Sequence, residues 1–543
     1  MNPGDLAISS EDWAQVPPNR SGTGSSGDEG RPGRSERSLT EVNRSQAKAE
    51  EAGTDSGEVL RTHSTDEGGE PQGSREGAAT VSTGGKGGTA GRSGTMVHQR
   101  DIELGEGCQT PLSRLTELAQ EDAARKFYSI AHLLTRQAFY EAFKHLRKDA
   151  SAGVDQVTYR DYQRELGRNL QNLWERVKGG QYRALPLRRI YIPKDDGKTR
   201  PISIPALEDK IVQAATVRVL NAIYEVDFRP CSFGSRPGRH CHQALDEIDR
   251  IIFREPITYV LELDITAYFD SIVRKHLLEM MERRVTDKSI LRLIGKWINV
   301  GVIDEGRLLQ TEEGVGQGQV ISPFLANVYL HYVLDRWFEE EVKSRLKGKA
   351  YLVRYVDDAV ICFEREEDAQ KVREVLGKRF AKYGLTLHPE KTRLVEFGRK
   401  ALEKAEKEGQ QPGTFDFLGF THICTRSRRG KFTMTVRTMK KRLRRNLKKV
   451  AVWCKNNRHE PVADQCAALN DKLRGHYQYY GRASNHSGIE RYYRAVRKVW
   501  RKWLSRRTRG KPLYWDAFNR LLQRHPLEVP RITHAYASLR SPS

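Results

Sequence analysis

The chain contains 543 residues, of which 93 are lysine or arginine and 70 are aspartate or glutamate, giving a formal net charge of +23. A chain of this length has ample material for a core and for several structural units, and its charge favours a polyanionic partner. Its seven cysteines form no C-x-x-C pair, which argues against a zinc site and a disulfide scaffold. No apolar run approaches the roughly 18 residues of a membrane span, so we expect a cytoplasmic protein associated with RNA or with the nucleoid.

Residues 1–100 are rich in Gly, Ser, Thr, Glu and Arg and contain almost no aromatic residue after Trp13. This composition cannot bury enough apolar surface to fold by itself, so we predict a disordered extension. The simplest interpretation is a dispensable tail. A second hypothesis is that the native protein starts at Met96, because globular patterning begins soon after it, and the mass of the native product would decide.

Regular patterning begins after this extension. Apolar residues recur at helical spacing over 112–146 and again over 206–224, which predicts amphipathic helices. Between them, residues 188–202 are typical of a β-hairpin with an Asp-Asp-Gly turn and basic residues on both arms. Basic residues on an exposed hairpin are usually only solvated charge. Lys194 and Arg200 are nevertheless suited to meet a triphosphate, arginine by a forked contact and lysine as a point charge.

Two later stretches place carboxylates at the ends of β-prone runs. Residues 259–263 form an apolar run followed by Asp264, and Asp357 and Asp358 lie between two further β-prone runs. The second pattern predicts a tight hairpin with two adjacent acids at its tip. Such a pair is most often only turn chemistry. Because adjacent carboxylates repel each other, a divalent metal is the alternative, and the three acids could together hold two metal ions for phosphoryl transfer.

In combination these motifs resemble the palm of a reverse transcriptase. They are Asp-Ile-x-x-aromatic-Phe-Asp (264–270), Gln-Gly-x-x-x-Ser-Pro (317–323) and Tyr-Val-Asp-Asp (355–358). With the C-terminal signature described below, the chain is similar, over about 111–533, to the reverse transcriptase/maturases encoded by bacterial group II introns. This resemblance implies an α/β (α+β) right-hand polymerase with fingers and palm, followed by an all-helical thumb that is also the maturase domain.

The resemblance assigns catalytic roles to the acids. Asp264, Asp357 and Asp358 would hold two Mg²⁺ ions, which Mn²⁺ could replace, and the carbonyl of Ile265 would add a ligand. The residues implied in binding the incoming dNTP are Lys194, Arg200, Tyr268, Gln317 and Lys391.

Two of these nucleotide contacts have simpler explanations. Tyr268 would exclude a ribose 2′-OH by its bulk, but it could be a core aromatic, which is the interpretation we favour for Phe269. Lys391 would lie near the metal ions or the phosphates, and a salt-bridged surface position is almost as simple an explanation.

The segment 314–319 departs from the family pattern Gly-Thr-Pro-Gln-Gly. Val315 and Gly316 replace the Thr and Pro, and Gln319 stands where a small residue is common. Gly318 would let the backbone approach the nascent base pair. Loss of the proline predicts a looser loop, with altered nucleotide affinity or fidelity. A single long helix is predicted to follow over 324–338.

Residues 421–510 contain 26 lysines and arginines against 4 acidic residues. Two helical apolar stripes, within 439–454 and 489–504, leave this charge on their outer faces, which suits a phosphate backbone. Between them, residues 473–480 interleave aromatic and basic side chains, as structured RNA requires, and resemble the maturase signature of the family. The predicted RNA contacts are Arg442, Arg445, Lys448, Arg474, Gly475, His476, Tyr479 and Tyr480.

The expected domains are the extension (1–100), the N-terminal extension with the fingers (110–255), the palm (256–422), the thumb/maturase domain (423–510) and a short tail (511–543). The implied partners are group II intron RNA, an RNA template with a DNA or RNA primer, target DNA and dNTPs. No membrane is implied, and the oligomeric state stays open. Because few residues and no paired cysteines follow Trp515, we expect no Cys/His endonuclease domain.

Three alternatives remain. The protein could be a splicing cofactor with vestigial polymerase activity, or a domesticated reverse transcriptase in DNA repair or phage defence. A purely RNA-binding protein is the third alternative, which the three placed aspartates disfavour.

Overall fold

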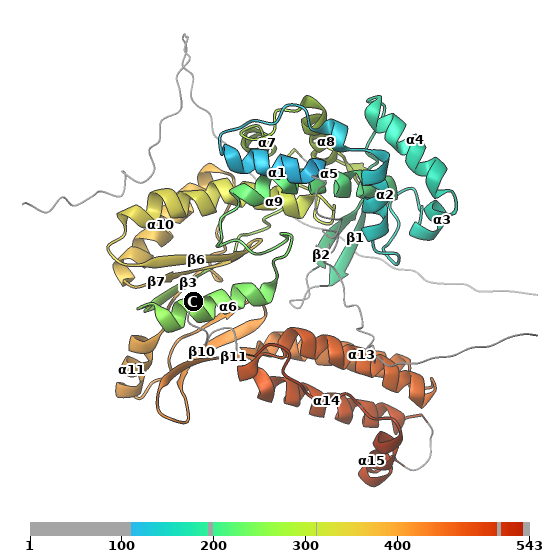
Figure 1. Cartoon of the computed structure of the whole chain (residues 1–543). Coiled ribbons are helices and arrows are strands. Elements are labelled where there is room, and N and C mark those ends of the chain that lie inside the picture. Colours follow the sequence, from blue (N-terminus) through green and yellow to red (C-terminus); the bar gives the residue numbers. More distant parts are fainter. Residues whose placement is uncertain (1–109, 194–198, 311, 508–511, 536–543) are drawn as a thin grey trace, which may run out of the picture. The chain divides into compact units, whose positions relative to one another are not determined.

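The computed structural model of the chain describes residues 110–193, 199–310, 312–507 and 512–535 (Figure 1). The predicted disordered extension lies outside the described residues, and so do Lys194 and the turn of the predicted basic hairpin. Within the described ranges the chain is a mixed α/β protein with three β-sheets, which confirms the predicted fold class at this level. No helix in these ranges is long and apolar enough to cross a membrane.

The N-terminal part packs helices around one central helix. α5 (Leu207–Asp227) is buried on most of its surface because its residues are apolar or small on nearly every face. The first two helices contact it. The helices that precede α5 are α1 (Pro111–Glu121), α2 (Arg136–His145), α3 (Tyr159–Arg164) and α4 (Leu166–Lys178).

The predicted basic hairpin is confirmed as β1 (Leu187–Pro193) and β2 (Thr199–Ile204), an antiparallel pair. A later segment extends this sheet, because β1 pairs in parallel with β4 (Val302–Asp304), which pairs in turn with β5 (Arg307–Leu309). The resulting order is β2-β1-β4-β5. The hairpin is thereby attached to the segment that leads into residues 314–319.

A second sheet lies at the centre of the fold, with the order β6-β7-β3-β8. Its strands are β3 (Tyr259–Leu263), β6 (Ala350–Tyr355), β7 (Asp358–Phe363) and β8 (Arg393–Glu396). β6 and β7 form the predicted hairpin, and β3 lies antiparallel to β7. The strand that precedes the first acid is therefore a direct neighbour of the hairpin that carries the other two.

The alternation of side chains along these strands separates two cores. Leu261 and Ile361 belong to the core that includes α10 (Glu366–Lys382), while Val260 belongs to the core that includes α6 (Cys241–Arg254). Because neighbouring residues of a strand point to opposite faces, α10 and α6 cover opposite faces of the sheet (Figure 1). Burial on both faces explains why the strands read as continuous apolar runs.

The long helix predicted after the Ser-Pro step is present, but its hydrogen-bond pattern changes along its length. α9 (Ser322–Leu330) continues into π-helical turns over His331–Asp335 and Trp337–Val342. Most side chains of α9 and of the first π-helical turn are buried, so packing on all sides holds this geometry. Three further helices lie along the chain before the third sheet. α7 (Arg274–Met281) and α8 (Lys288–Ile298) come between β3 and β4, and α11 (Arg399–Lys407) comes between β8 and β9.

A third sheet corrects the expected start of the helical domain. β9 (Thr414–Phe417), β10 (Phe420–Arg426) and β11 (Phe432–Thr438) form consecutive antiparallel pairs. The predicted all-helical domain from residue 423 was therefore wrong up to Thr438, and its first helix begins at Lys440. The physical reason is the alternation of β-branched residues with buried ones across β10 and β11, which suits a strand better than a helix.

Within its described residues, the C-terminal part contains four α-helices. They are α12 (Lys440–Asn456), α13 (Val462–Tyr480), α14 (His486–Leu504) and α15 (Trp515–Arg524). Val450 and Cys454 of α12 and Ile489 and Trp500 of α14 are buried, so the two predicted apolar stripes are confirmed as buried faces. The expected tail in fact contains α15, whose Phe518 packs in an edge-to-face contact with Trp500.

Candidate active site

Asp264 lies where β3 ends, beside the hairpin. The last paired residues of β3 and β7 are Leu263 and Ala359, so Asp264 follows directly opposite Asp358. Opposite residues of an antiparallel pair have Cα atoms about 4.5–5.5 Å apart. The amide of His388 donates to the Asp264 carbonyl at 2.8 Å and holds its backbone. The structure thus brings the predicted acids of the strand and of the hairpin together.

The hairpin carries one acid in a two-residue turn and the other at the first position of β7. Tyr355 pairs with Asp358, so only Val356 and Asp357 lie in the loop. Val356 has a φ of 58°, a left-handed conformation that a β-branched residue rarely adopts. In tight hairpins this position usually carries glycine. A strained backbone of this kind costs about 1–3 kcal/mol and persists only where the surroundings hold it.

The acids carry more negative charge than their surroundings neutralise. Partial burial, followed by the nearby Asp264 carboxylate, raises the pKa of Asp357. For Asp358, loss of hydration to the surrounding protein and then repulsion by Asp357 and Asp264 raise the pKa to about 6, although the residue is still open to solvent. A bound cation would relieve this repulsion.

The donor set suits a hard divalent cation, since it consists of carboxylate oxygens. Across the described ranges of the chain, no group of three or more His, Cys, Asp or Glu side chains is arranged to hold a metal ion. At Asp264, Oδ2 forms an ion pair of 2.6 Å with Nζ of Lys391. Lys391 therefore lies at the acids, as the resemblance implied, and its ammonium occupies the place where a cation is expected.

The other predicted contacts differ in their distance from the acids. Arg200 on β2 is near enough for its charge to favour ionisation of Asp357. Ile265 is buried and forms an isolated bridge with Leu387, and a role for its carbonyl stays a prediction. Gln317 accepts a hydrogen bond on its carbonyl from the amide of Ser203 at 2.7 Å, which ties its loop to the end of β2.

The loop around Gly316 is not loose, which corrects the expectation drawn from the missing proline. A Cβ at Gly316 would lie 2.7 Å from Leu187 and 2.9 Å from Gln319, so the loop is closely packed. Gln319 is only 3% exposed and donates to the carbonyl of Trp297 at 3.1 Å, while accepting from Gln213 at 2.9 Å. The buried Gln319 thus ties this loop to Trp297 and to Gln213 of α5.

Of the two neighbouring aromatics, Tyr268 is buried and Phe269 is partly exposed, the opposite of the burial that we expected. Tyr268 is 3% exposed, and its hydroxyl donates to the carbonyl of Ala326 at 2.6 Å. Phe269 is partly exposed and accepts on its carbonyl the amide of Val315 at 2.8 Å. Tyr268 is a core residue in this conformation, whereas Phe269 is open to the side of the loop at 314–319.

We expect Phe269→Val to weaken discrimination against ribonucleotides by about 10-fold, because a smaller side chain leaves room for a 2′-OH. Tyr268→Phe should leave discrimination unchanged, because it removes only a buried hydroxyl. Incorporation of a single rNTP and a single dNTP opposite the same template base measures both variants. Tyr268→Phe keeps the bulk of the ring, so the outcome that would restore the role first assigned to Tyr268 is unchanged discrimination in Phe269→Val.

The predicted RNA contacts separate into buried and accessible residues. His476 stacks on Tyr492 with ring centres 3.6 Å apart, and His476 and Tyr480 are 6% and 7% exposed. Tyr479 donates its hydroxyl to the carbonyl of Leu418 at 2.9 Å. These rings complete the core between α13 and its neighbours, so in this conformation they are not free to stack on bases.

The basic residues of the same prediction remain at the surface, and one of them is ion-paired within the chain. Arg442 is partly exposed and close enough to Asp358 to lower its pKa, opposing the larger shift upward. Arg445, Lys448 and Gly475 are also partly or fully exposed, and their contact with RNA stays a prediction. Arg474 is committed to Glu528 at 3.0 Å and to Asp471, so it binds the C-terminal segment of this chain.

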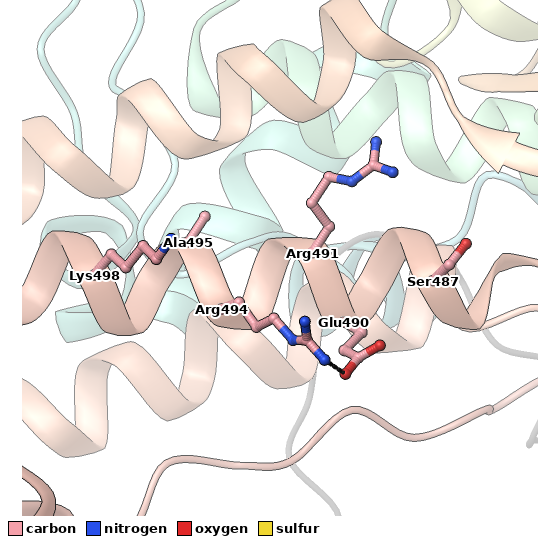
Figure 2. A pocket seen from close by; sticks show the side chains of 6 residues that line it. All are labelled: Ser487, Glu490, Arg491, Arg494, Ala495 and Lys498. Atoms are coloured by element: carbon pink, nitrogen blue, oxygen red, sulfur yellow. Dashed lines mark hydrogen bonds and ion pairs between the residues drawn. The ribbon is translucent and has the colours of Figure 1, made fainter.

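A second basic surface on α14 was missed among the predicted contacts. Figure 2 shows Arg491, Arg494 and Lys498 around a shallow hollow that Ser487 and Glu490 also line. Arg494 is paired with Glu490, which leaves Arg491 and Lys498 as the principal charges of the hollow. The spacing of apolar residues along this helix predicted its buried face. It also implied that the basic residues lie on the exposed face.

Comparison with known proteins agrees with this site. Residues 192–422 match the family described as reverse transcriptase (RNA-dependent DNA polymerase). Protein YkfC of Escherichia coli (strain K12) is 33% identical over 295 residues, which are 48% of this chain and 77% of that protein. Group II intron-encoded protein LtrA of Lactococcus lactis subsp. cremoris is 30% identical over 283 residues, which are 49% of this chain and 46% of LtrA.

A third relative is the uncharacterized 91 kDa protein in cob intron of Schizosaccharomyces pombe, 38% identical over 187 residues, or 34% of this chain and 22% of that protein. The chain thus spans less than half the length of these two intron-encoded relatives. The matched family range contains all three aspartates and Lys391. The chain belongs to the reverse transcriptases, which are RNA-directed DNA polymerases, and among them to the reverse transcriptase/maturases encoded by group II introns.

Proposed function

We propose that this chain extends a primer on an RNA template with Asp264, Asp357 and Asp358 as ligands of two divalent metal ions, with Mg²⁺ as the expected ion. The observation that carries the proposal is the pairing of β3 with β7, which puts Asp264 opposite Asp358. When bound, such ions would favour ionisation of the primer 3′-hydroxyl and neutralise charge on the pyrophosphate leaving group.

The residues around the acids would bind and orient the nucleotide. Lys391 has a single compact charge and 60% of its side chain is exposed, so it can exchange the Asp264 carboxylate for a phosphate oxygen. Arg200 can reach the same triphosphate with its forked donors. Gly318, with a φ of 119°, gives a side-chain-free backbone next to the end of β2, where a base pair can approach.

We also propose that the chain binds the RNA of its group II intron and stabilises the folded intron without a chemical step of its own. The support is the excess of basic residues on α12 and α14, whose apolar faces are buried. The central acids would thus be used for synthesis and the C-terminal helices for RNA binding. In retrohoming, the spliced intron RNA would be the template and the target DNA would supply the primer.

Primer extension tests the polymerase part of this proposal. The full chain should extend a DNA primer on an RNA template with dNTPs and Mg²⁺, and a chelator should stop extension reversibly. Splicing of the cognate intron RNA, measured with and without the protein at low Mg²⁺, tests the maturase part. Splicing assistance with no extension under any divalent metal would instead establish a maturase with vestigial polymerase activity.

Neutralising the α14 surface should weaken RNA binding in a salt-dependent manner. For Arg491→Gln, Arg494→Gln and Lys498→Gln combined, we expect about 10-fold lower affinity and a salt slope reduced by roughly 2–3, since each lost phosphate contact removes about one released counterion. Filter binding at several salt concentrations measures both quantities. The matched control neutralises three exposed cations of α10, Lys371, Arg373 and Lys378, and an equal loss there would rule out a specific α14 surface.

A further inference from the structure

A fully buried arginine lies directly before the catalytic turn. Arg354 and Asp335 are both 0% exposed and form a two-pronged ion pair, with Nε to Oδ1 at 2.7 Å and Nη2 to Oδ2 at 2.6 Å. Arg354 belongs to β6, and Asp335 ends the first π-helical turn after α9. Insertions of π-helix into α-helices occur frequently at functional sites.

The other donors of this guanidinium form hydrogen bonds with the turn and with two polar side chains next to it. Nη1 donates to the carbonyl of Val356 at 2.9 Å and to Oδ1 of Asn327 at 2.9 Å, and Nη2 donates to Oγ of Ser232 at 2.8 Å. An arginine has five N–H donors in a fixed planar arrangement, and these bonds together with the ion pair use all five. The Val356 carbonyl belongs to the residue with the left-handed backbone.

The opposite side of the turn is closed by a glycine. A Cβ at Gly234 would lie 2.6 Å from the backbone nitrogen of Val356, so no other residue fits there without a shift. The carbonyl of Gly234 accepts from Nδ2 of Asn327 at 2.7 Å. Asn327 therefore connects both sides of the turn, one through Arg354 and the other through Gly234.

We propose that Arg354 is a positioning residue for catalysis, whose guanidinium holds Val356 in its left-handed conformation and so fixes the direction in which Asp357 leaves the turn. A strained residue persists only where its surroundings over-determine it, and the Arg354 bond to its carbonyl, with the close backbone contact at Gly234, supplies that constraint. The ion pair with Asp335 makes the burial of the charge possible. The inference rests on the polymerase function, which extension by the unaltered chain tests separately.

Lysine cannot replace this arginine, because an ammonium has three donors on one nitrogen and no planar fork. We expect Arg354→Lys to lower kcat for primer extension by about 100-fold, the effect of a catalytic group displaced by about 1 Å. The KM for dNTP and the Kd for template-primer should change by less than about 3-fold, since neither ligand touches the guanidinium.

A matched control separates positioning from general stability. Arg284 is also buried, pairs with Asp227 at 2.9 Å and donates to the carbonyls of Asp122 and Arg125, but it has no bond to the turn. Arg284→Lys should lower the Tm as Arg354→Lys does, with kcat nearly unchanged below the transition. Hydrogen exchange of the peptide containing Val356 and Asp357 should accelerate only in Arg354→Lys.

If Arg354→Lys does not fold, the double variant Arg354→Met with Asp335→Leu replaces the ion pair by apolar side chains of similar size, which is often tolerated. The same loss of kcat and faster exchange at the turn are expected from it. A kcat within 3-fold of the unaltered chain in whichever variant folds, or unchanged exchange at the turn, would overturn the proposal. Equal losses of kcat in Arg284→Lys would overturn it too.

Discussion

Asp357→Asn is expected to reduce primer extension by at least about 10³-fold, which corresponds to about 4 kcal/mol of transition-state stabilisation. The amide keeps the size of the side chain but removes the negative charge that would hold a divalent cation beside Asp264 and Asp358. Neutral amide oxygens are weaker ligands for Mg²⁺ than carboxylates. Single-turnover extension on an RNA template, with enzyme in excess, measures the loss without interference from product release.

The variant should nevertheless fold and bind RNA normally. Asp357 is repelled by Asp264, which contributes to its raised pKa, so removal of its charge leaves the Tm equal or slightly higher in the absence of divalent ions. The matched control is Asp416→Asn, an exposed aspartate on β9, which should keep full extension activity. Loss of RNA binding or of splicing assistance in Asp357→Asn would contradict the separation of synthesis from the maturase role.

The central site was largely predictable because its information is local. The hairpin at 355–358 is encoded by two β-prone runs around a short polar turn, and the register follows from that turn, because turn type and loop length fix the register of a hairpin. The strand that ends at Asp264 has the same kind of signal. Once both strands are in one sheet, the meeting of the acids follows from their positions at the strand ends.

The polar connections around that site could not be predicted in the same way. Arg354 reads as one more charged residue in an apolar strand, and its partners Asp335, Asn327 and Ser232 are spread over more than a hundred residues of sequence. No periodicity relates such residues, since their pairing depends on tertiary packing. The same limitation explains the misassignment of Tyr268, because neighbouring aromatics have identical local signals and only the fold decides which one is buried.

The sequence did not show which residues of the aromatic signature at 473–480 are buried, for a related reason. Interleaved aromatic and basic residues are typical of RNA-binding surfaces, but a helix that packs on one side alternates buried and exposed residues in a similar manner. In α13 the rings of His476 and Tyr480 fall on the buried side and Gly475 on the exposed side. With these rings buried, the proposed RNA contacts are the exposed basic residues of α12 and α14.

Arg482→Met is expected to destabilise the connection between the C-terminal helices and α6 by about 3–5 kcal/mol, because it leaves a buried charge without its partner. Arg482 follows α13 and is 4% exposed. It donates to Asp249 at 2.7 Å and to Asp246 at 2.9 Å, both on α6. Thermal unfolding at pH 8 should show a Tm lower on the order of 10 °C, and limited proteolysis should cleave the C-terminal helices first.

The pH dependence distinguishes this mechanism from a simple loss of packing. Burial raises the pKa of Asp249 to about 6 even with Arg482 opposing it, and loss of the arginine must raise this pKa further. A carboxyl group with a raised folded-state pKa destabilises the fold above that pKa, and protonation removes the penalty as the pH falls. The loss of stability in Arg482→Met should therefore be larger at pH 8 than at pH 5.5.

Adding Asp249→Leu to Arg482→Met should recover most of the stability at pH 8, while adding Asp246→Leu should not, because 43% of the Asp246 side chain is exposed and its charge stays hydrated. A deficit that is the same at both pH values, or equal recovery by both second substitutions, would show that the arginine acts through its packing and not through the buried charge of Asp249.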